Sequence, residues 1–176
     1  MEDILINRYM PAYQFSEYHE ITGYGSLADY FTAAKQMDMA QSFLVKSLFW
    51  LRGLPVNDLR LPRFLQNMHF TYLDENAPKE FLIAFWLKPD SKGPVFIDDK
   101  EHFIKETDPW TQKVTWNFRF EKIEKGKIRM STETRIFCLN KKAKKTFSIY
   151  WFFIRPFSGF IRKRMLAIIK NKVENI

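Results

Sequence analysis

The last quarter of the chain limits the possible folds most strongly, because it joins a run of aromatic residues to a proline and several cations. Residues 148–166 read SIYWFFIRPFSGFIRKRML. The longest apolar run without a charge near this end, residues 147–154, is far shorter than the ~20 residues that cross a bilayer. The sequence therefore excludes a membrane span here and predicts one wall of a folded interior.

Apolar side chains recur every three or four residues along this segment, which predicts a long amphipathic helix. The apolar stripe consists of Phe147, Tyr150, Trp151, Ile154, Phe157, Ile161, Met165, Ile168 and Ile169. Pro156 removes one helical hydrogen bond, so the helix should bend there. The cations fall mostly off the stripe, and we expect them to face solvent: Arg155, Arg162, Lys163, Lys170 and Lys172.

Strands are predicted upstream by alternation of apolar and polar residues. Residues 13–21 alternate with period two and read as a strand. Residues 69–87 predict two strands around a turn at 75–78, and residues 112–139 predict a long hairpin that turns at Lys125 and Gly126. Residues 95–106 suggest one or two further strands.

Two short helices are expected between the first and second strands. Ser26 is a suitable N-cap for a helix over residues 27–36. A second helix is expected within residues 38–55, where Gly53 and Pro55 supply the stop signal. Residues 56–67 look irregular.

The element order is a strand, two helices, an antiparallel run of strands and one long helix. This order predicts an α+β fold with helices packed on an antiparallel sheet. The length of 176 residues fits a single domain spanning residues 1–176. A strongly curved sheet that closes on a long helix would leave a space between them.

The chain is unusually aromatic, with 18 Phe and 17% Phe, Trp and Tyr. Each aromatic side chain buries ~150–250 Å². More rings than a tight core requires indicate either a second apolar surface or a cavity lined with rings.

The positive charge is concentrated at the C-terminal end. The net charge is +8, and residues 141–176 contain ten Lys or Arg but only one acid, Glu174. Nucleic-acid binding would require exposed aromatic residues between these cations, whereas the rings here are expected to be buried. We therefore predict no nucleic-acid partner. A weak contact between the basic helix and an anionic membrane surface stays open.

Several motifs resemble a known family. They are EYHEI at residues 17–21, LFWLRGLP at 48–55, TETR at 132–135, Phe147 with Tyr150-Trp151, and Ile154-Arg155-Pro156 with Ser158-Gly159 and Ile161-Arg162. Together they resemble an uncharacterised bacterial branch of the START-related, polyketide-cyclase-like superfamily (SRPBCC). The resemblance implies the helix-grip fold, in which about seven antiparallel strands wrap around the C-terminal helix. It implies a cavity but no particular reaction, because members of one fold perform different functions.

Signals of enzymatic chemistry are sparse. The histidines His19, His69 and His102 are scattered without the spacing of metal ligands, and the glycines of GYGS do not complete a nucleotide-binding motif. Cys138 lies on the apolar face of a predicted strand, which favours a structural thiol over a nucleophile. We expect no metal, no cofactor and no catalytic residue. The N-terminus lacks the cations and long apolar run of a secretory signal, so a cytoplasmic location is expected.

Two pairs of polar residues form the best candidate cluster, Glu17 with His19 and Glu133 with Arg135. If the first and last strands are neighbours, the four could meet on one face and bind a ligand. The alternative is ion pairing on the outer face, with each pair contributing under ~1 kcal/mol. The apolar neighbours of Thr132 and Thr134 favour an outward position for Glu133 and Arg135.

We expect a small hydrophobic ligand, lipid-like or aromatic, between the sheet and the C-terminal helix. Its binding residues are expected to be Trp86, Trp116, Phe118, Thr132, Thr134, Tyr150, Trp151 and Ile154. One alternative is a cyclase- or hydrolase-like enzyme that uses Glu17 and His19 in the cavity. The other is an interaction module whose rings pack without a void.

Overall fold

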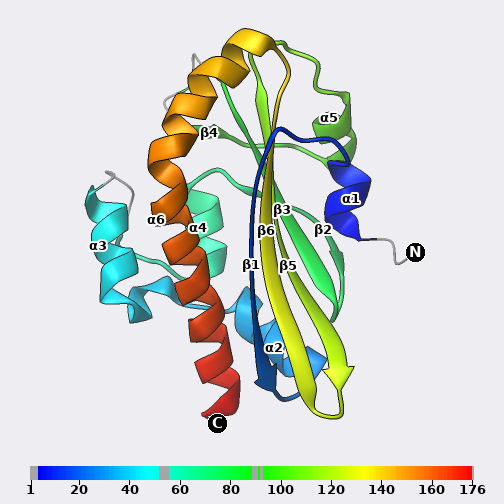
Figure 1. Cartoon of the computed structure of the whole chain (residues 1–176), viewed down its shortest axis with the longest axis vertical. Helices are drawn as coiled ribbons and strands as arrows, with labels where there is room; N and C mark the ends of the chain where they lie inside the picture. The colour runs from blue at the N-terminus through cyan, green and yellow to red at the C-terminus, as the bar shows by residue number, and fades with distance from the viewer. Residues whose placement is uncertain (1–3, 52–55, 89–90, 92, 176) are drawn as a thin grey trace.

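A computed structural model describes residues 4–51, 56–88, 91 and 93–175. Its centre is a curved antiparallel sheet in the order β1-β6-β5-β3-β2, with β4 paired to β3 (Figure 1). The strands are β1 (Phe15–Tyr24), β2 (Thr71–Asn76), β3 (Glu80–Leu87), β4 (Pro94–Val95), β5 (Gln112–Glu124) and β6 (Lys127–Cys138). The α+β prediction is confirmed, but the described residues form six strands rather than about seven.

Helices cover both faces of the sheet. They are α1 (Leu5–Tyr9), α2 (Leu27–Lys35), the 3-10 helix η1 (Met39–Gln41), α3 (Phe43–Leu51), α4 (Leu61–Asn67), α5 (Lys100–Lys105) and α6 (Lys141–Glu174). The helix predicted over residues 27–36 is confirmed, and Ser26 caps it by accepting a hydrogen bond from the Asp29 N–H. The second predicted helix divides into η1 and α3. Its stop signal, Gly53 and Pro55, lies outside the described residues.

Two predictions of local structure are wrong. Residues 56–67 are not irregular throughout, because they contain α4, in which a proline occupies one of the first two positions. Residues 95–106 contain only the last residue of the short strand β4, and half of them form α5. Asp99 begins that helix by accepting a hydrogen bond from the His102 N–H at 2.7 Å, an N-cap interaction that overrides the short apolar alternation.

The main core lies between one face of the sheet and the helices α2, α3, α4 and α6. Phe81 and Phe118 on the sheet are fully buried there, together with Tyr30 of α2 and Ile169 of α6. A second core on the opposite face packs α1 and α5 against β3 (Figure 1). We call the face covered by α6 the inner face and the face covered by α1 the outer face.

Asn140 caps the start of α6, because its side chain accepts a hydrogen bond from the Ala143 N–H at 2.7 Å. The helix continues through Pro156 without a break and follows a curved path along the sheet (Figure 1). At its end, Glu174 accepts hydrogen bonds from the Tyr24 N–H at 2.7 Å and the Tyr30 hydroxyl at 3.3 Å. Burial and the Glu174 carboxylate together raise the pKa of Tyr30 to about 12.

The predicted apolar stripe of α6 is buried over much of its length, including Phe147, Ile161 and Met165. It is wrong at Tyr150 and Phe157, each of which is 45% exposed. Two residues of a helix turn through about 200°, so Phe157 points away from the side on which Gly159 meets β1.

A buried polar network attaches α1 to the outer face. Glu80 is 3% exposed and accepts hydrogen bonds from the Leu5 N–H at 2.9 Å and the Asn117 side-chain amide at 2.8 Å. Arg135 donates to the Met10 carbonyl at 3.0 Å and pairs with Glu133 at 2.7 Å. The predicted outward position of Glu133 and Arg135 is therefore confirmed, and the pair serves to hold the N-terminal segment.

Replacing Glu80 should destabilise the fold, because its carboxylate accepts hydrogen bonds from α1 and from Asn117. Glu80→Ala leaves the buried Asn117 amide and the first N–H of α1 without acceptors, which should lower the free energy of unfolding by about 3 kcal/mol. Glu101→Ala is the matched control, because the Glu101 side chain is 76% exposed and pairs with the exposed Lys105. It should change stability by less than about 0.5 kcal/mol. Equal midpoints of denaturant unfolding for the two variants would contradict the role of Glu80.

Candidate functional site

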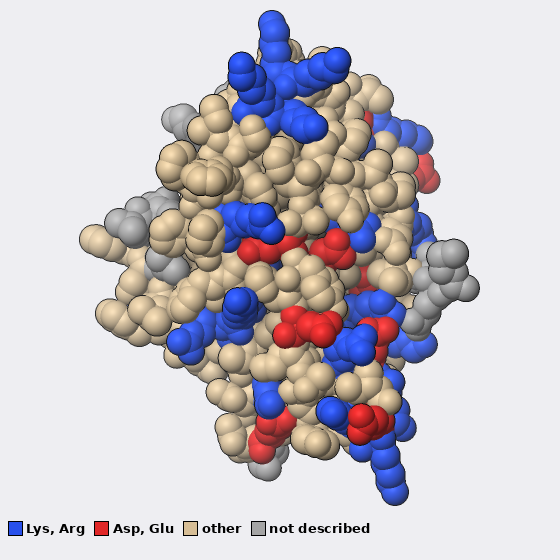
Figure 2. All heavy atoms as spheres, in the orientation of Figure 1, with Lys and Arg blue, Asp and Glu red and all other residues tan. Residues whose placement is uncertain are grey.

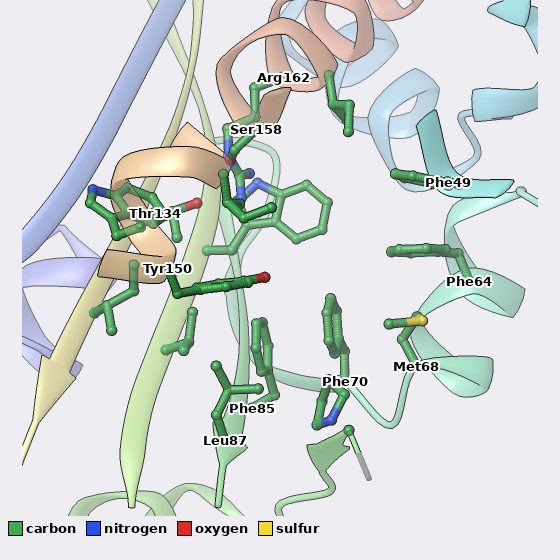
Figure 3. A pocket seen from close by; sticks show the side chains of 18 of the residues that line it. Phe49, Phe64, Met68, Phe70, Phe85, Leu87, Thr134, Tyr150, Ser158 and Arg162 are labelled. Atoms are coloured by element: carbon green, nitrogen blue, oxygen red, sulfur yellow. The ribbon is translucent and has the colours of Figure 1, made fainter. Parts of the chain in front are cut away.

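A partly open cavity of about 360 Å³ lies between the inner face of the sheet and the helices α3, α4 and α6. Its volume falls within the ~300–1,000 Å³ range of small-molecule sites. The rings and aliphatic groups of one wall come from α3, α4, β3 and the residues beside them (Figure 3). They are Phe49, Phe64, Met68, Phe70, Phe85 and Leu87.

The rings of this wall contact one another and are held in place. Phe70 and Phe85 are stacked with centroids 3.9 Å apart, and Phe49 and Phe64 are stacked at 5.3 Å. Phe64 meets Phe70 edge to face at 5.8 Å. The four rings therefore form a continuous apolar wall that needs no ligand to organise it.

Strand register determines which sheet residues reach the cavity. Glu17, Thr134, Trp116 and Ile83 are paired in one row across β1, β6, β5 and β3. The adjacent row toward the start of α6 contains Phe15, Ile136, Val114 and Phe85. Cavity-lining residues come from both rows.

Five of the eight residues expected to bind a ligand line this cavity, namely Trp116, Thr134, Tyr150, Trp151 and Ile154. Trp116 and Thr134 come from adjacent strands, and the other three come from α6. The stripe on α6 and the alternation of the long hairpin were sufficient to place them.

The other three expected residues lie elsewhere. Trp86 is on the outer face, where its ring lies 4.7 Å from that of His102. Phe118 is fully buried in the main core, and its ring centroid lies 5.0 Å from that of Phe81. Thr132 is engaged in the sheet, because its hydroxyl accepts from the Trp116 indole N–H at 2.8 Å and donates to the Asn117 carbonyl at 2.7 Å.

The sequence analysis named neither the phenylalanine wall nor Ser158 nor Arg162 as part of a cavity, and Arg162 is the charged residue among these missed cavity residues. Its Nε and Nη1 atoms are enclosed and have no hydrogen-bond partner among the described residues, and its guanidinium carbon lies 4.8 Å from the centroid of the Trp116 ring. Burial lowers the pKa of Arg162 to about 10, and the negative charge of Glu17 opposes that shift. Arg162 therefore remains a cation at neutral pH. The prediction that the cations of α6 face solvent is wrong for this residue.

A signal for Arg162 was present in the spacing. Arg162 follows Ser158 by four residues and Ile154 by eight, which places all three on one side of a helix. All three line the cavity. Arg162 was not grouped with Ile154 and Ser158, because the cations of this helix were all expected to face solvent.

Glu17 and His19 also face inward, beneath α6. Glu17 Oε1 lies 3.0 Å from His19 Nε2, and Glu17 is 6% exposed. A Cβ atom at Gly159 would overlap with Glu17 Oε1 and approach His19 Nε2 to 3.0 Å, so glycine permits the helix to lie close to this pair. Neither Glu17 nor His19 lines the cavity.

The four-residue cluster considered from the sequence does not form. Glu17 pairs with Thr134 and Tyr18 pairs with Glu133 across β1 and β6. Strand alternation therefore places Glu17 and Glu133 on opposite faces of the sheet. The two strands are neighbours as expected, but the register separates the two charged pairs.

Cys138 is buried next to the start of α6, and burial raises the pKa of its thiol to about 11. Its thiolate fraction at about pH 8 should be on the order of a hundredfold lower than that of a free cysteine. We expect native protein to react with iodoacetamide at least that much more slowly than protein unfolded in guanidinium, as followed by mass spectrometry. Equal rates in the two states would show that the thiol is accessible and ionised.

No protein-family model matches the chain, and no curated protein or solved structure is significantly similar to it. Among the described helices, none is both long and apolar enough to cross a membrane. Within the described ranges, no three His, Cys, Asp or Glu side chains gather as a set of metal ligands.

Proposed function

We propose that this protein binds a small hydrophobic molecule, lipid-like or aromatic, in the cavity between the sheet and α6. The observation that carries the proposal is the cavity of about 360 Å³ with its wall of stacked rings. Removing apolar ligand surface from water would supply the driving force, at ~25 cal/mol per Å². Carriage or sensing of such a molecule requires no chemical step.

We also propose that the fold is a helix-grip fold of the SRPBCC type. The support is the curved antiparallel sheet, the pairing of β1 with β6, and the long α6 lying on the inner face. The motifs on β6 and α6 that resemble the superfamily include residues that line the cavity, among them Thr134, Trp151 and Arg162.

The geometry favours binding over the two alternatives. An enzyme that used Glu17 and His19 would need to present them to a substrate, whereas both lie against α6 at Gly159. A packed interaction module would have rings interdigitated without a void. The observed cavity favours a ligand over such packing.

A fluorescent apolar probe provides a direct test. We expect N-phenylnaphthylamine to bind with increased fluorescence and to quench the tryptophans, because Trp116 and Trp151 line the cavity. Ser158→Trp should weaken that binding at least about tenfold, because a large ring would occupy the space into which the ligand must fit.

Ser148→Trp is the matched control. Ser148 belongs to the same helix, is not a cavity-lining residue, and donates its hydroxyl hydrogen bond to the Lys145 carbonyl at 2.7 Å. This variant should bind the probe like the unmodified protein. Circular dichroism and thermal unfolding would establish that both variants are folded. Unchanged binding in folded Ser158→Trp would overturn the assignment of this cavity.

A further inference from the structure

The cavity is polar on one side and apolar on the other. Ser158, Thr134 and Arg162 lie together near α6 and β6, whereas Phe49, Phe64 and Phe70 lie across the space from them (Figure 3). The Tyr150 hydroxyl points into the space between the two groups (Figure 3). A purely apolar ligand would leave the polar side without partners.

Two groups on the polar side have unused hydrogen-bonding capacity. Within the part of the chain that the structure describes, the enclosed Arg162 Nε and Nη1 atoms have no acceptor and the buried Thr134 Oγ1 has no partner. Enclosed donors without acceptors are costly, and more so when they belong to a charged group. A ligand that supplies an anionic acceptor at this position would recover that cost.

We infer that the cavity takes an amphipathic carboxylate, with its carboxylate at Arg162 and Thr134 and its apolar tail along the phenylalanine wall. This inference rests on the proposed function, because it specifies the chemical class of the ligand for the same cavity. Arg162 donates to the carboxylate from the helix side, and the Thr134 hydroxyl donates from the sheet side. The tail is desolvated against Phe70 and Phe85.

Glu17 affects the electrostatic potential at Arg162, although Glu17 itself does not line the cavity. Its carboxylate is near enough to act electrostatically on Arg162, yet the two side chains form no ion pair among the described contacts. Glu17 Oε1 is engaged by His19 at 3.0 Å. Arg162 therefore keeps donors available to a ligand, while Glu17 partly offsets the positive potential that attracts it.

Dodecanoate and dodecanol form a suitable pair of test ligands, because they share a tail and differ in the head group. Displacement of N-phenylnaphthylamine at neutral pH should give at least about tenfold tighter binding for dodecanoate than for dodecanol. If the protein binds neither the two compounds nor the probe, the proposed function is wrong. Equal binding of both compounds would leave the hydrophobic cavity intact and overturn the carboxylate inference alone.

Substitutions at Arg162 and at the neighbouring Lys163 test where the ligand carboxylate binds. Arg162→Gln should weaken dodecanoate about tenfold and change dodecanol by less than about twofold, while Arg162→Lys should retain part of the preference. Lys163→Gln removes the adjacent, exposed cation and should leave both affinities unchanged. An equal loss of dodecanoate binding in Lys163→Gln would show that overall charge, and not the position of Arg162, sets the preference.

Glu17→Gln provides a test in the opposite direction. Removing the offsetting negative charge should strengthen dodecanoate binding severalfold and leave dodecanol binding unchanged. Weaker dodecanoate binding in a folded Glu17→Gln variant would contradict the arrangement, because it would show that the Glu17 carboxylate favours the ligand anion. This variant keeps the inference testable if Arg162→Gln does not fold.

The side of α6 that faces away from the sheet is also apolar. Side chains at three- and four-residue spacing form a second apolar stripe there, opposite the buried one. The exposed fractions are 61% for Ile149, 75% for Phe152 and 65% for Phe153. Phe43 and Trp50 of the adjacent α3 are also exposed. A helix segment that is apolar all round, with one side facing water, indicates a second apolar environment.

Cations bracket this exposed stripe. Lys142 and Lys145 precede it on the same face, and Lys163 and Arg164 follow it; all four are exposed. Helix α6 contains no Asp or Glu before Glu174. Figure 2 shows Lys and Arg side chains gathered at the end of the molecule where α6 begins.

We propose that this face docks on an anionic lipid bilayer. Phe152 and Phe153 enter the interface between head groups and acyl chains, while the flanking cations contact the anionic head groups. Charge complementarity favours a lipid surface over a protein partner, because the cations lie at both ends of an apolar strip on a helix that has no acid before Glu174.

Sedimentation with vesicles tests this docking surface. The protein should bind vesicles that contain phosphatidylserine, bind phosphatidylcholine vesicles weakly, and dissociate as salt is raised. The double variant Phe152→Ala/Phe153→Ala should lose at least about tenfold in affinity, and Lys142→Gln should lose about fivefold.

Phe96→Ala is the matched control, because Phe96 is 54% exposed and lies outside both α3 and α6. It should bind like the unmodified protein. Failure of the unmodified protein to bind any vesicle would overturn the lipid proposal and favour a protein partner for this face. Unchanged binding by the double variant would show that the rings are not the contact.

Discussion

The structure depends on how closely α6 approaches the sheet. Gly159 allows the helix backbone to lie against Glu17 and His19 of β1, where a Cβ atom would overlap with the carboxylate. The C-terminal half of the helix buries Met165 and Ile169 in the main core. The preceding turns stand over the cavity, so one helix both completes the core and forms a wall of the binding space.

The sides of α6 consequently have different chemical environments. One side lines the cavity and includes Ile154, Ser158 and Arg162. The outward side exposes Phe152 and Phe153. Because an apolar face turned to water is unfavourable, the outward rings indicate an external apolar contact in the same way that the inward rings indicate an internal one. A single helix thereby connects the inferred ligand site with the inferred lipid surface.

Local patterns were reliable where one periodicity dominated. Alternation located β1 and the long hairpin, and helical spacing located α6. Prediction was weaker for β3, because both of its faces are buried and its sequence shows no alternation between apolar and polar residues. Phe85 and Trp86 are equally suitable as cavity residues by composition, yet only the register with β5 places Phe85 inside and Trp86 outside. Phe118 and Thr132 face inward but occupy the neighbouring row, which the core fills.

The sequence by itself determined the α+β class, the positions of β1, the long hairpin and α6, the concentration of positive charge at the C-terminal end, and the high content of aromatic residues. These properties depend on residue identity and on short-range spacing. Only the tertiary structure decided that Arg162 points inward, that Phe157 is exposed, and that Glu17 and Glu133 lie on opposite faces. These placements depend on strand register and on the distance between α6 and the sheet, which arise from contacts between residues far apart in the chain.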